Sequence, residues 1–531
     1  MRSGRSISGR SCRSPAEQRV SGTGSGLRPE NFLRPDETLT LAVYLRHRLR
    51  VRRRPGSAID LAELGKRITL AQLRTERRRI LKHSIAQVRK FAKRFGMKVR
   101  RVDVLGRCVT LSAKARDAER AFSTRLIWVD DNGDLRHCPR RAPRMPQPLK
   151  RIAHAVVGLD TRKPRLSRLR ENVIANAGDG LLPSEIARLY GLTTSGRGAG
   201  QCIAIIEPAG GYKPDDVAKA CAAMQIAPPR IDDITVGKGR NNPGINAKAD
   251  TEVALDIQVV AGVAPEARIV VYFTELSEPG LVAGVSRAVH GTPRPNVIIL
   301  TWGEPETIWP RDSLSGLEAV LQDAMRLHIT VVATAGDDLA GERMGPGKVY
   351  VNYPASSPYV LACGGTQVAL DATRTAIVDE VVWNDDGVRG TGGGISAEYV
   401  VPAFQTSAQL PVSLNDGKPG RGVPDVAAAA APINGYRIFL NGDELVASGT
   451  SAVAPLWGAF VALLNAERGA ALGFINDRLY QVPSLLKPIV SGDNIDILSG
   501  LGYTAGPGWN ACAGLGSPKG AAIIAAMTAT S

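Results

Sequence analysis

The chain has 531 residues, of which 44% are hydrophobic, and a formal net charge of +17. This length exceeds that of one ordinary domain, and the apolar content is enough for a large core, so we expect two or more globular units. No apolar run reaches the roughly 18 residues that a membrane-spanning helix needs, and the first residues show no apolar signal-peptide region, so we expect a soluble protein without an obvious Sec signal.

The positive charge lies in the N-terminal third. Residues 1–170 hold 43 Lys and Arg against 14 Asp and Glu, whereas the remainder holds 24 against 36. Such asymmetry fits a basic unit that docks on an acidic domain of the same chain, or an arm that binds nucleic acid. Few aromatic residues interleave with the arginines, and we find no nucleic-acid-binding motif, which favours docking within the chain.

The seven cysteines are scattered and include no Cys-x-x-Cys pair, which argues against a zinc knuckle and against a disulfide framework. Cys202 and Cys363 stand in apolar runs, and we expect them to be buried free thiols.

Residues 1–36 are rich in Ser, Gly and Arg, which predicts a basic leader without a fold. From residue 37, strand-like and helical patterns alternate and predict a small α+β domain that ends near Arg162. The expected strands are Thr38–Leu45, Lys98–Leu105, Cys108–Ser112 and Arg125–Val129, and the expected helices are Leu70–Arg79, Ser84–Phe95 and Ala113–Phe122. Residues 163–180 are polar, as in an exposed linker that proteases cut easily.

From residue 181 on, short runs of apolar and β-branched residues alternate with helical patterns. The strand-like runs are Gln201–Ile206, Arg268–Phe273, Asn296–Leu300 and Ile329–Thr334, and the helical ones are Asp215–Met224, Asp250–Val260 and Leu314–Leu327. Continuous apolar strands between helices predict an α/β fold with a parallel sheet that helices cover on both faces. Functional side chains are then expected at the carboxyl ends of the strands.

A run of small residues, Ser448-Gly-Thr-Ser451, leads directly into an apolar, helix-like stretch. Small residues let the backbone turn sharply and leave the Ser451 hydroxyl unobstructed in the first turn of a buried helix, which makes Ser451 a candidate nucleophile. The same residues are suited to cap that helix, since Ser and Thr are preferred there. The local sequence alone favours the cap.

Acidic residues occur in two places that suit catalysis. Glu252 and Asp256 stand four residues apart and would share one face of a helix, where two buried carboxyl groups share a proton and titrate together in the acidic range. The alternative is a pair of exposed acids on a surface helix, which their apolar neighbours disfavour. Asp337 and Asp338 follow an apolar strand, where they lie at its carboxyl end or cap a turn.

A Ser-His-Asp triad lacks a suitable histidine. Four of the six histidines lie in the basic N-terminal third, which leaves His290 and His328. His290-Gly-Thr292 is similar to the histidine motif of subtilisin-like proteases, but the Pro-Arg-Pro that follows predicts a loop, whereas such a histidine opens a helix.

A series of motifs runs in one order through the C-terminal two thirds of the chain: Gln201-Cys-Ile-Ala-Ile-Ile-Glu207, Glu252-Val-Ala-Leu-Asp256, Thr301-Trp-Gly303, Ala335-Gly-Asp337, Tyr353-Pro-Ala-Ser-Ser-Pro-Tyr-Val-Leu-Ala-Cys-Gly-Gly-Thr366, Gly392-Gly-Gly394, Arg421-Gly-Val-Pro-Asp425, Gly449-Thr-Ser-Ala-Val-Ala-Pro455 and Gly506-Pro-Gly-Trp509. By these motifs the region from Leu182 to Ala526 resembles the catalytic domain of the sedolisin family, the serine-carboxyl peptidases, and especially its kumamolisin branch. Residues 37–162 similarly resemble that family's activation prodomain.

The resemblance implies a subtilisin-like fold and a role for each matching residue. Ser451 matches the nucleophile, Glu252 the general base, Asp256 the residue that orients it, and Asp337 the oxyanion-hole acid; Glu207 and Trp302 match an outer hydrogen-bonded network. A carboxylate accepts a serine proton only in a tuned, acidic setting, and a carboxyl group donates to an oxyanion only while protonated. The implied enzyme works in acid and loses activity as Asp337 ionises.

The family also binds calcium near the C-terminus, through two carboxylates and several backbone carbonyls. The matching carboxylate positions here are Pro488 and Asn510. Calcium favours anionic oxygen ligands, so we expect this chain to bind calcium weakly or not at all, and we assign no residue as a metal ligand. We also expect that the chemistry requires no cofactor. The neighbours that could still offer carbonyls are Ile489, Gly506 and Gly508, and those that could offer a substitute carboxylate are Asp493 and Asp496.

The sequence thus predicts the precursor of an acid-acting serine-carboxyl endopeptidase, with a leader (1–36), an inhibitory activation prodomain (37–162), a cleavable linker (163–180) and a catalytic domain (181–531). We expect protein or peptide substrates, a prodomain that docks on the catalytic domain of the same chain, a monomer, and no nucleic-acid or membrane partner. The resemblance implies an extracellular location. Two alternatives stay open, a non-catalytic binding protein on a peptidase scaffold and a nucleic-acid binder led by the Arg-rich arm.

Overall fold

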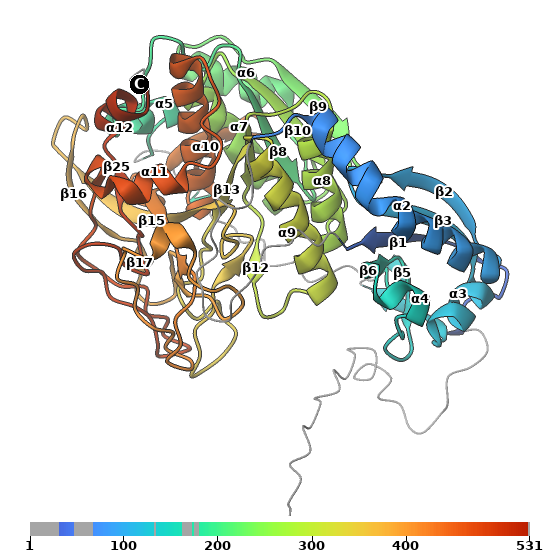
Figure 1. The fold of residues 1–531 in the computed structure, drawn as a ribbon. Helices are drawn as coiled ribbons and strands as arrows, with labels where there is room; N and C mark the ends of the chain where they lie inside the picture. The colour runs from blue at the N-terminus through green and yellow to red at the C-terminus, as the bar shows by residue number, and fades with distance from the viewer. Residues whose placement is uncertain (1–30, 47–66, 132–133, 162–172, 175–179, 529–531) are drawn as a thin grey trace, which may run out of the picture. The chain divides into compact units, whose positions relative to one another are not determined.

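The computed structural model describes residues 31–46, 67–131, 134–161, 173–174 and 180–528 (Figure 1). The chain forms two compact units: the first contains residues 1–45, 83–102 and 108–163, and the second contains residues 46–82, 103–107 and 164–531. Most of the predicted leader and linker lies outside the described residues. Leu33 is buried and its N–H donates to the Leu126 carbonyl (3.2 Å), so the folded chain begins before residue 37.

The first unit is built on an antiparallel sheet with the strand order β2-β3-β1-β6. Along β1, alternate residues are buried, as expected of a strand that has one face on a core. The α+β prediction for this region is confirmed. Its elements are β1 (Thr38–Leu45), β2 (Lys98–Asp103), β3 (Cys108–Lys114), α3 (Ala115–Phe122), β4 (Leu126–Asp131), β5 (Asp134–Pro139), α4 (Gln147–Lys150) and β6 (Ala153–Val157).

A single long helix, α2 (Leu70–Arg94), stands where the sequence predicted two. The predicted break was wrong because no Gly or Pro interrupts these residues. The helix continues from the second unit into the first after Lys82. Its residues up to Lys82 therefore pack as part of the larger, C-terminal unit.

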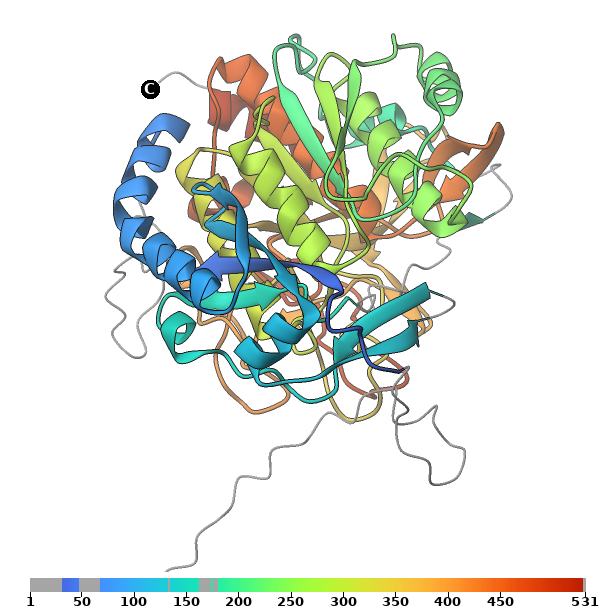
Figure 2. The same ribbon diagram turned by 90° about the vertical axis from the view of Figure 1, so that its right-hand side faces the viewer.

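The second unit contains an eight-stranded sheet, which runs β16-β15-β13-β11-β8-β10-β9 with β21 also paired to β15 (Figures 1 and 2). All pairings are parallel except that of β15 with β16. All residues of β8, β11 and β13 are buried, which confirms a parallel sheet covered on both faces. The strands are β8 (Cys202–Glu207), β9 (Ile231–Thr235), β10 (Arg268–Phe273), β11 (Val297–Leu300), β13 (Thr330–Thr334), β15 (Leu361–Leu370), β16 (Ile377–Val382) and β21 (Val426–Ala429).

Helices α7 and α10 pack against each other, and so do α8 and α9. The helices of this unit are α5 (Pro183–Leu189), α6 (Pro214–Ala223), α7 (Ala247–Val263), α8 (Glu278–His290), α9 (Arg311–Arg326), α10 (Thr450–Arg468), α11 (Asn476–Gln481) and α12 (Gly520–Thr528). Shorter strands are β7 (Val173–Ile174), β12 (Glu304–Pro305), β14 (Asn352–Tyr353), β17 (Asn384–Asp385), β18 (Arg389–Gly390), β19 (Gly394–Ile395), β20 (Gly422–Val423), β22 (Tyr436–Leu440), β23 (Asp443–Ala447), β24 (Leu486–Lys487) and β25 (Ser517–Pro518).

Cys202 and Cys363 are buried free thiols, as predicted. Within the described part of the chain, none of the helices combines the length and the apolar character needed to cross a membrane.

Candidate active site

Three adjacent strands of the large sheet deliver polar residues to one edge. Glu207 is the last residue of β8, Thr301 directly follows β11, and Asp337 follows β13. Because the carboxyl ends of parallel strands meet at one edge, these residues converge although they are far apart in sequence. This is the edge at which the sequence predicted functional side chains.

Helix α7 contributes the two candidate carboxyl groups that stand four residues apart. Asp256 is completely buried, and its Oδ2 accepts a hydrogen bond of 2.9 Å from the Thr301 hydroxyl. Glu252 lies one turn earlier on the same helix, with the Ser451 hydroxyl beside its carboxyl group. The burial of Asp256 rules out the alternative of two exposed acids on a surface helix.

Burial makes this group of carboxyls hold protons more tightly than usual. It raises the pKa of Glu207 and of Asp256 well above their ordinary values, and the neighbouring carboxylates raise both further. Trp302 Nε1 donates to Glu207 Oε2 (2.8 Å), which opposes the increase for Glu207. Each of these two carboxyl groups also influences the pKa of the other, as expected of buried neighbours that share a proton. The cluster therefore titrates as a coupled unit.

Burial is also the main cause of the shifted pKa of Glu252, the candidate base. Burial, and after it the charge of Asp337, raises the pKa of Glu252 to about 7, although hydrogen bonds from Ser451 and Thr301 oppose the increase. A carboxyl group tuned to this range exchanges a proton readily, which is the property that a general base needs.

Ser451 lies in the first turn of α10, and the structure bears on whether a side chain caps this helix. The N-cap of the helix is Gly449, whose φ of 116° is a conformation that L side chains rarely adopt. No side-chain hydrogen bond caps the helix, and the Thr450 hydroxyl donates to Asp337 Oδ1 (2.7 Å) instead. Because Pro455 has no N–H, it makes no helical hydrogen bond back to the Ser451 carbonyl.

Asp337 is held from the start of α10. Its Oδ1 accepts two hydrogen bonds, each of 2.7 Å, from the backbone N–H and the hydroxyl of Thr450. Behind it, the buried Asn352 donates to the Ala335 carbonyl (3.2 Å) and to Glu342 (3.0 Å). These contacts join the nucleophile turn and the Asp337 loop into one rigid assembly.

The sequence did not assign roles to Thr301 and Thr450, although both stand inside the motifs quoted above. Thr301 donates to Asp256, and Thr450 donates twice to Asp337. The only signal was their position, a hydroxyl directly after a buried strand and a hydroxyl directly before the candidate nucleophile.

His290 belongs to a different cluster. It ends α8, as the following Pro-Arg-Pro predicted, and its Nε2 lies 2.9 Å from Asp323 Oδ2 while its Nδ1 lies 3.2 Å from the Ser286 hydroxyl. Arg77 of α2 donates to Asp323 and to the Leu105 carbonyl, and all three side chains are almost completely buried. Although burial raises the pKa of Asp323, the charges of Arg77 and of its other partners hold it far below the ordinary value.

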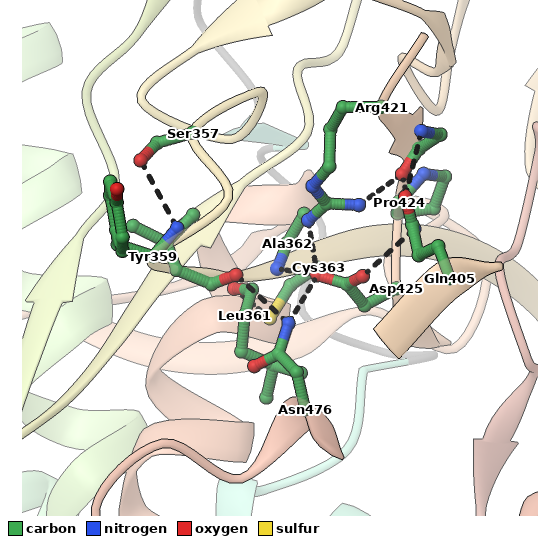
Figure 3. A network of polar contacts seen from close by, with 12 residues as sticks. Ser357, Tyr359, Leu361, Ala362, Cys363, Gln405, Arg421, Pro424, Asp425 and Asn476 are labelled. Atoms are coloured by element: carbon green, nitrogen blue, oxygen red, sulfur yellow. Dashed lines mark hydrogen bonds and ion pairs between the residues drawn. The ribbon is translucent and has the colours of Figure 1, made fainter. Parts of the chain in front are cut away.

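The motif from Arg421 to Asp425 forms a second buried polar network, which Figure 3 shows. Asp425 accepts hydrogen bonds from Arg421 (2.6 Å), the Ala362 N–H (2.8 Å), Asn476 (3.1 Å) and Tyr480 (2.8 Å). Arg421 and Asp425 are both completely buried. A buried charge pair of this kind is tolerated because so many donors satisfy the carboxylate. The network holds Asp425, the residue before β21, against the first residues of β15.

Known proteins with similar sequences identify the family of this chain. Residues 27–162 match the family model of the pro-kumamolisin activation domain, and residues 234–473 match that of the subtilase family. Kumamolisin from Bacillus sp. (strain MN-32) is 37% identical over 457 residues, which cover 83% of this chain and 82% of that protein. Tripeptidyl-peptidase sed5 from Aspergillus fumigatus is 27% identical, with 92% of this chain and 93% of that protein covered.

A solved structure gives the same result for the fold. Pseudomonas sedolisin, a serine-carboxyl proteinase complexed with two molecules of pseudo-iodotyrostatin, aligns with a TM-score of 0.59 at 27% identity, over 66% of this chain and 99% of that chain. An activation domain ahead of a subtilisin-like sheet, in a sequence that is 37% identical to kumamolisin over 83% of its length, defines the enzyme class. This chain is a kumamolisin-like serine peptidase of the sedolisin family and carries its own activation prodomain.

Proposed function

We propose that this chain is the precursor of an acid-acting endopeptidase, which hydrolyses peptide bonds through an acyl-enzyme on Ser451. The observation that carries the proposal is the placement of the Ser451 hydroxyl beside Glu252, a partly buried carboxyl group with a raised pKa. A serine hydroxyl is a weak nucleophile unless an adjacent base accepts its proton. Here the base is a carboxylate, and His290 is engaged with Asp323.

Each candidate residue then has one task. Glu252 takes the proton of Ser451 as the oxygen attacks the peptide carbonyl, and returns it to the leaving amine. Asp337, while protonated, donates a hydrogen bond to the oxyanion that develops on the carbonyl. Asp256 and Glu207, held by Thr301 and Trp302, position Glu252 and share protons behind it.

The charges of Glu252 and Asp337 together explain why we expect the enzyme to act in acid. The reactive form needs an ionised Glu252 and a protonated Asp337, so these two groups together carry one negative charge. Ionisation of both removes the oxyanion donor, and protonation of both removes the base. Because each charge opposes the other, we expect a bell-shaped pH dependence with its maximum on the acid side of neutrality.

We propose that maturation is a self-cleavage between about Arg162 and Gly180. Strand β7, at residues 173–174 of this linker, pairs antiparallel with β23, and Val173 lies opposite Ala447. Four residues after Ala447 comes Ser451. A linker that pairs with the strand leading to the nucleophile supports cleavage within the same chain.

We expect acid to promote cleavage of the linker without breaking the buried ion pair between Arg77 and Asp323. The low pKa of Asp323 keeps this carboxylate ionised throughout the acidic range, so the ion pair with Arg77 persists there. Mild acid therefore does not release this ion pair, and we attribute the pH dependence of processing to that of catalysis.

The relatives support our proposals for the mode of cleavage, the location and the oligomeric state. The greater identity to kumamolisin than to the tripeptidyl-peptidase favours cleavage inside polypeptides over removal of tripeptides. An extracellular location and a monomeric state complete the proposal.

The test is the pH profile of casein digestion by the matured enzyme, its Glu252→Gln variant and the control Glu266→Gln, an exposed residue paired with Arg197. We expect a maximum below neutrality, a loss of roughly 10³-fold in kcat for Glu252→Gln, and no change for the control. Activity that peaks near neutrality and ignores Glu252→Gln would refute the mechanism. Peptide binding without hydrolysis at any pH would favour the binding-protein alternative, and salt-dependent DNA binding by residues 1–170 without peptidase activity would favour the nucleic-acid binder.

A further inference from the structure

Asn510 occupies the centre of the loop where the family resemblance placed a calcium ion. The side chain is buried, and its Nδ2 donates to the carbonyl of Ile489 (2.9 Å) and to that of Gly506 (3.3 Å). Its Oδ1 accepts from the backbone N–H groups of Cys512 (3.2 Å) and Ala513 (3.0 Å). Both hydrogens and both acceptor sites of the amide are thus used.

The two carbonyls explain why a positive group is needed at this point. Ile489 and Gly506 belong to separate stretches of the loop, yet their carbonyl oxygens converge on one atom. Converging oxygens repel each other unless a cation or N–H donors stand between them. The reversed amide orientation would set Oδ1 against both carbonyls and Nδ2 against both N–H groups, so only the observed orientation is favourable.

We infer that the Asn510 amide replaces a calcium ion, so that this peptidase holds its C-terminal loop without metal. Calcium takes six to eight oxygen ligands, several of them anionic. Here an N–H-bearing nitrogen lies among the carbonyls, and Pro488, at the other matching carboxylate position, offers no side-chain oxygen. Among the residues that the structure describes, no His, Cys, Asp and Glu side chains gather as a group that could hold a metal.

The two substitute carboxylates that the sequence suggested serve other contacts. Asp493 Oδ1 accepts from Asn384 (2.8 Å) and from the Ile495 N–H (3.0 Å). Asp496 accepts from the N–H groups of Leu498 (2.9 Å) and Ser499 (3.3 Å). Both stabilise their own turns and leave the Asn510 site to the amide.

The test is thermal unfolding of the full precursor at neutral pH, in EDTA and in millimolar calcium chloride, with Ser451→Ala as the parent to prevent self-digestion. We expect the same midpoint for the parent in both solutions. Asn510→Asp sets a carboxylate against two carbonyls, so its midpoint falls by roughly 3–6 °C in EDTA. Calcium is expected to restore it, because the loop then offers an anionic ligand.

The matched control is Asn434→Asp, since Asn434 donates to a single carbonyl, that of Val368 (3.0 Å). We expect a lower midpoint that calcium does not restore. A parent midpoint that rises with calcium would overturn the inference, and this measurement needs no folded variant at position 510. An Asn510→Asp midpoint that calcium leaves unchanged would overturn it as well.

Discussion

Replacement of Asp337 by asparagine separates the two tasks that the mechanism assigns to this residue. Asp337 Oδ1 accepts two hydrogen bonds of 2.7 Å from Thr450. The amide oxygen of Asp337→Asn keeps both, which directs its NH₂ group to the place of the second carboxyl oxygen. The variant therefore retains a donor for the oxyanion but can no longer ionise.

Two consequences follow for the rate and for the pH profile. Complete loss of an oxyanion donor costs roughly 10²- to 10³-fold in kcat, so a weaker donor in the same place is expected to cost roughly 10- to 100-fold. After burial, the charge of Asp337 is the main cause that raises the pKa of Glu252 to about 7. This charge is absent in the reactive form, where Asp337 is protonated, so the acid limb, which follows Glu252, should stay close to its place in Asp337→Asn.

The alkaline limb is the decisive part of the profile. Because asparagine keeps its N–H donor as the pH rises, the alkaline limb should disappear in Asp337→Asn. The assay is kcat/KM on an internally quenched peptide across the acidic and neutral range, for the matured enzyme, Asp337→Asn and Asp338→Asn. Asp338 is the matched control, because it is buried beside Asp337 but lies 3.7 Å from Arg343. An alkaline limb that stays in place in Asp337→Asn would refute the shared-charge mechanism.

Three further predictions concern maturation and stability. Ser451→Ala should leave the precursor uncleaved in acid, as followed by gel electrophoresis, and processing at the normal rate would exclude self-cleavage. Arg421→Met should lower the free energy of unfolding by roughly 3–5 kcal/mol because Asp425 stays buried without its cation; a denaturant titration measures this, and the double variant with Asp425→Leu should recover part of the loss. Arg77→Met should destabilise the precursor more at neutrality than at about pH 4, because burial raises the pKa of Asp323 once the Arg77 charge is gone and a protonated Asp323 no longer needs that partner; an equal loss at both pH values would contradict this.

Much of the fold could be predicted because buried parallel strands leave a strong pattern. Strands β8, β10, β11 and β13 appear as continuous apolar runs, and the structure places them within a residue of the predicted bounds. The sequence did not indicate β15, whose centre holds Gly364 and Gly365, residues that weaken a strand pattern. A Cβ at either would come within 2.6 Å of a neighbouring side chain, so close packing requires the glycines.

The site was predictable only in part. Helical spacing brought Glu252 and Asp256 together, because a helix fixes the distance between residues four apart. No local pattern relates Thr301 to Asp256, or Thr450 to Asp337, because each pair meets only once the strands have assembled. The same holds for Arg77 and Asp323, which are 246 positions apart.

The Asn510 amide has a consequence for an enzyme whose surroundings change in acidity during its life. Protons compete with metal ions for carboxylates, so a calcium loop loosens as the solution becomes acidic. An amide has no proton to gain in this range, so acidification removes neither the contact of Asn510 with Ile489 nor that with Gly506. Acid therefore changes the protonation of the carboxyl groups around Ser451 and leaves this part of the scaffold as it was.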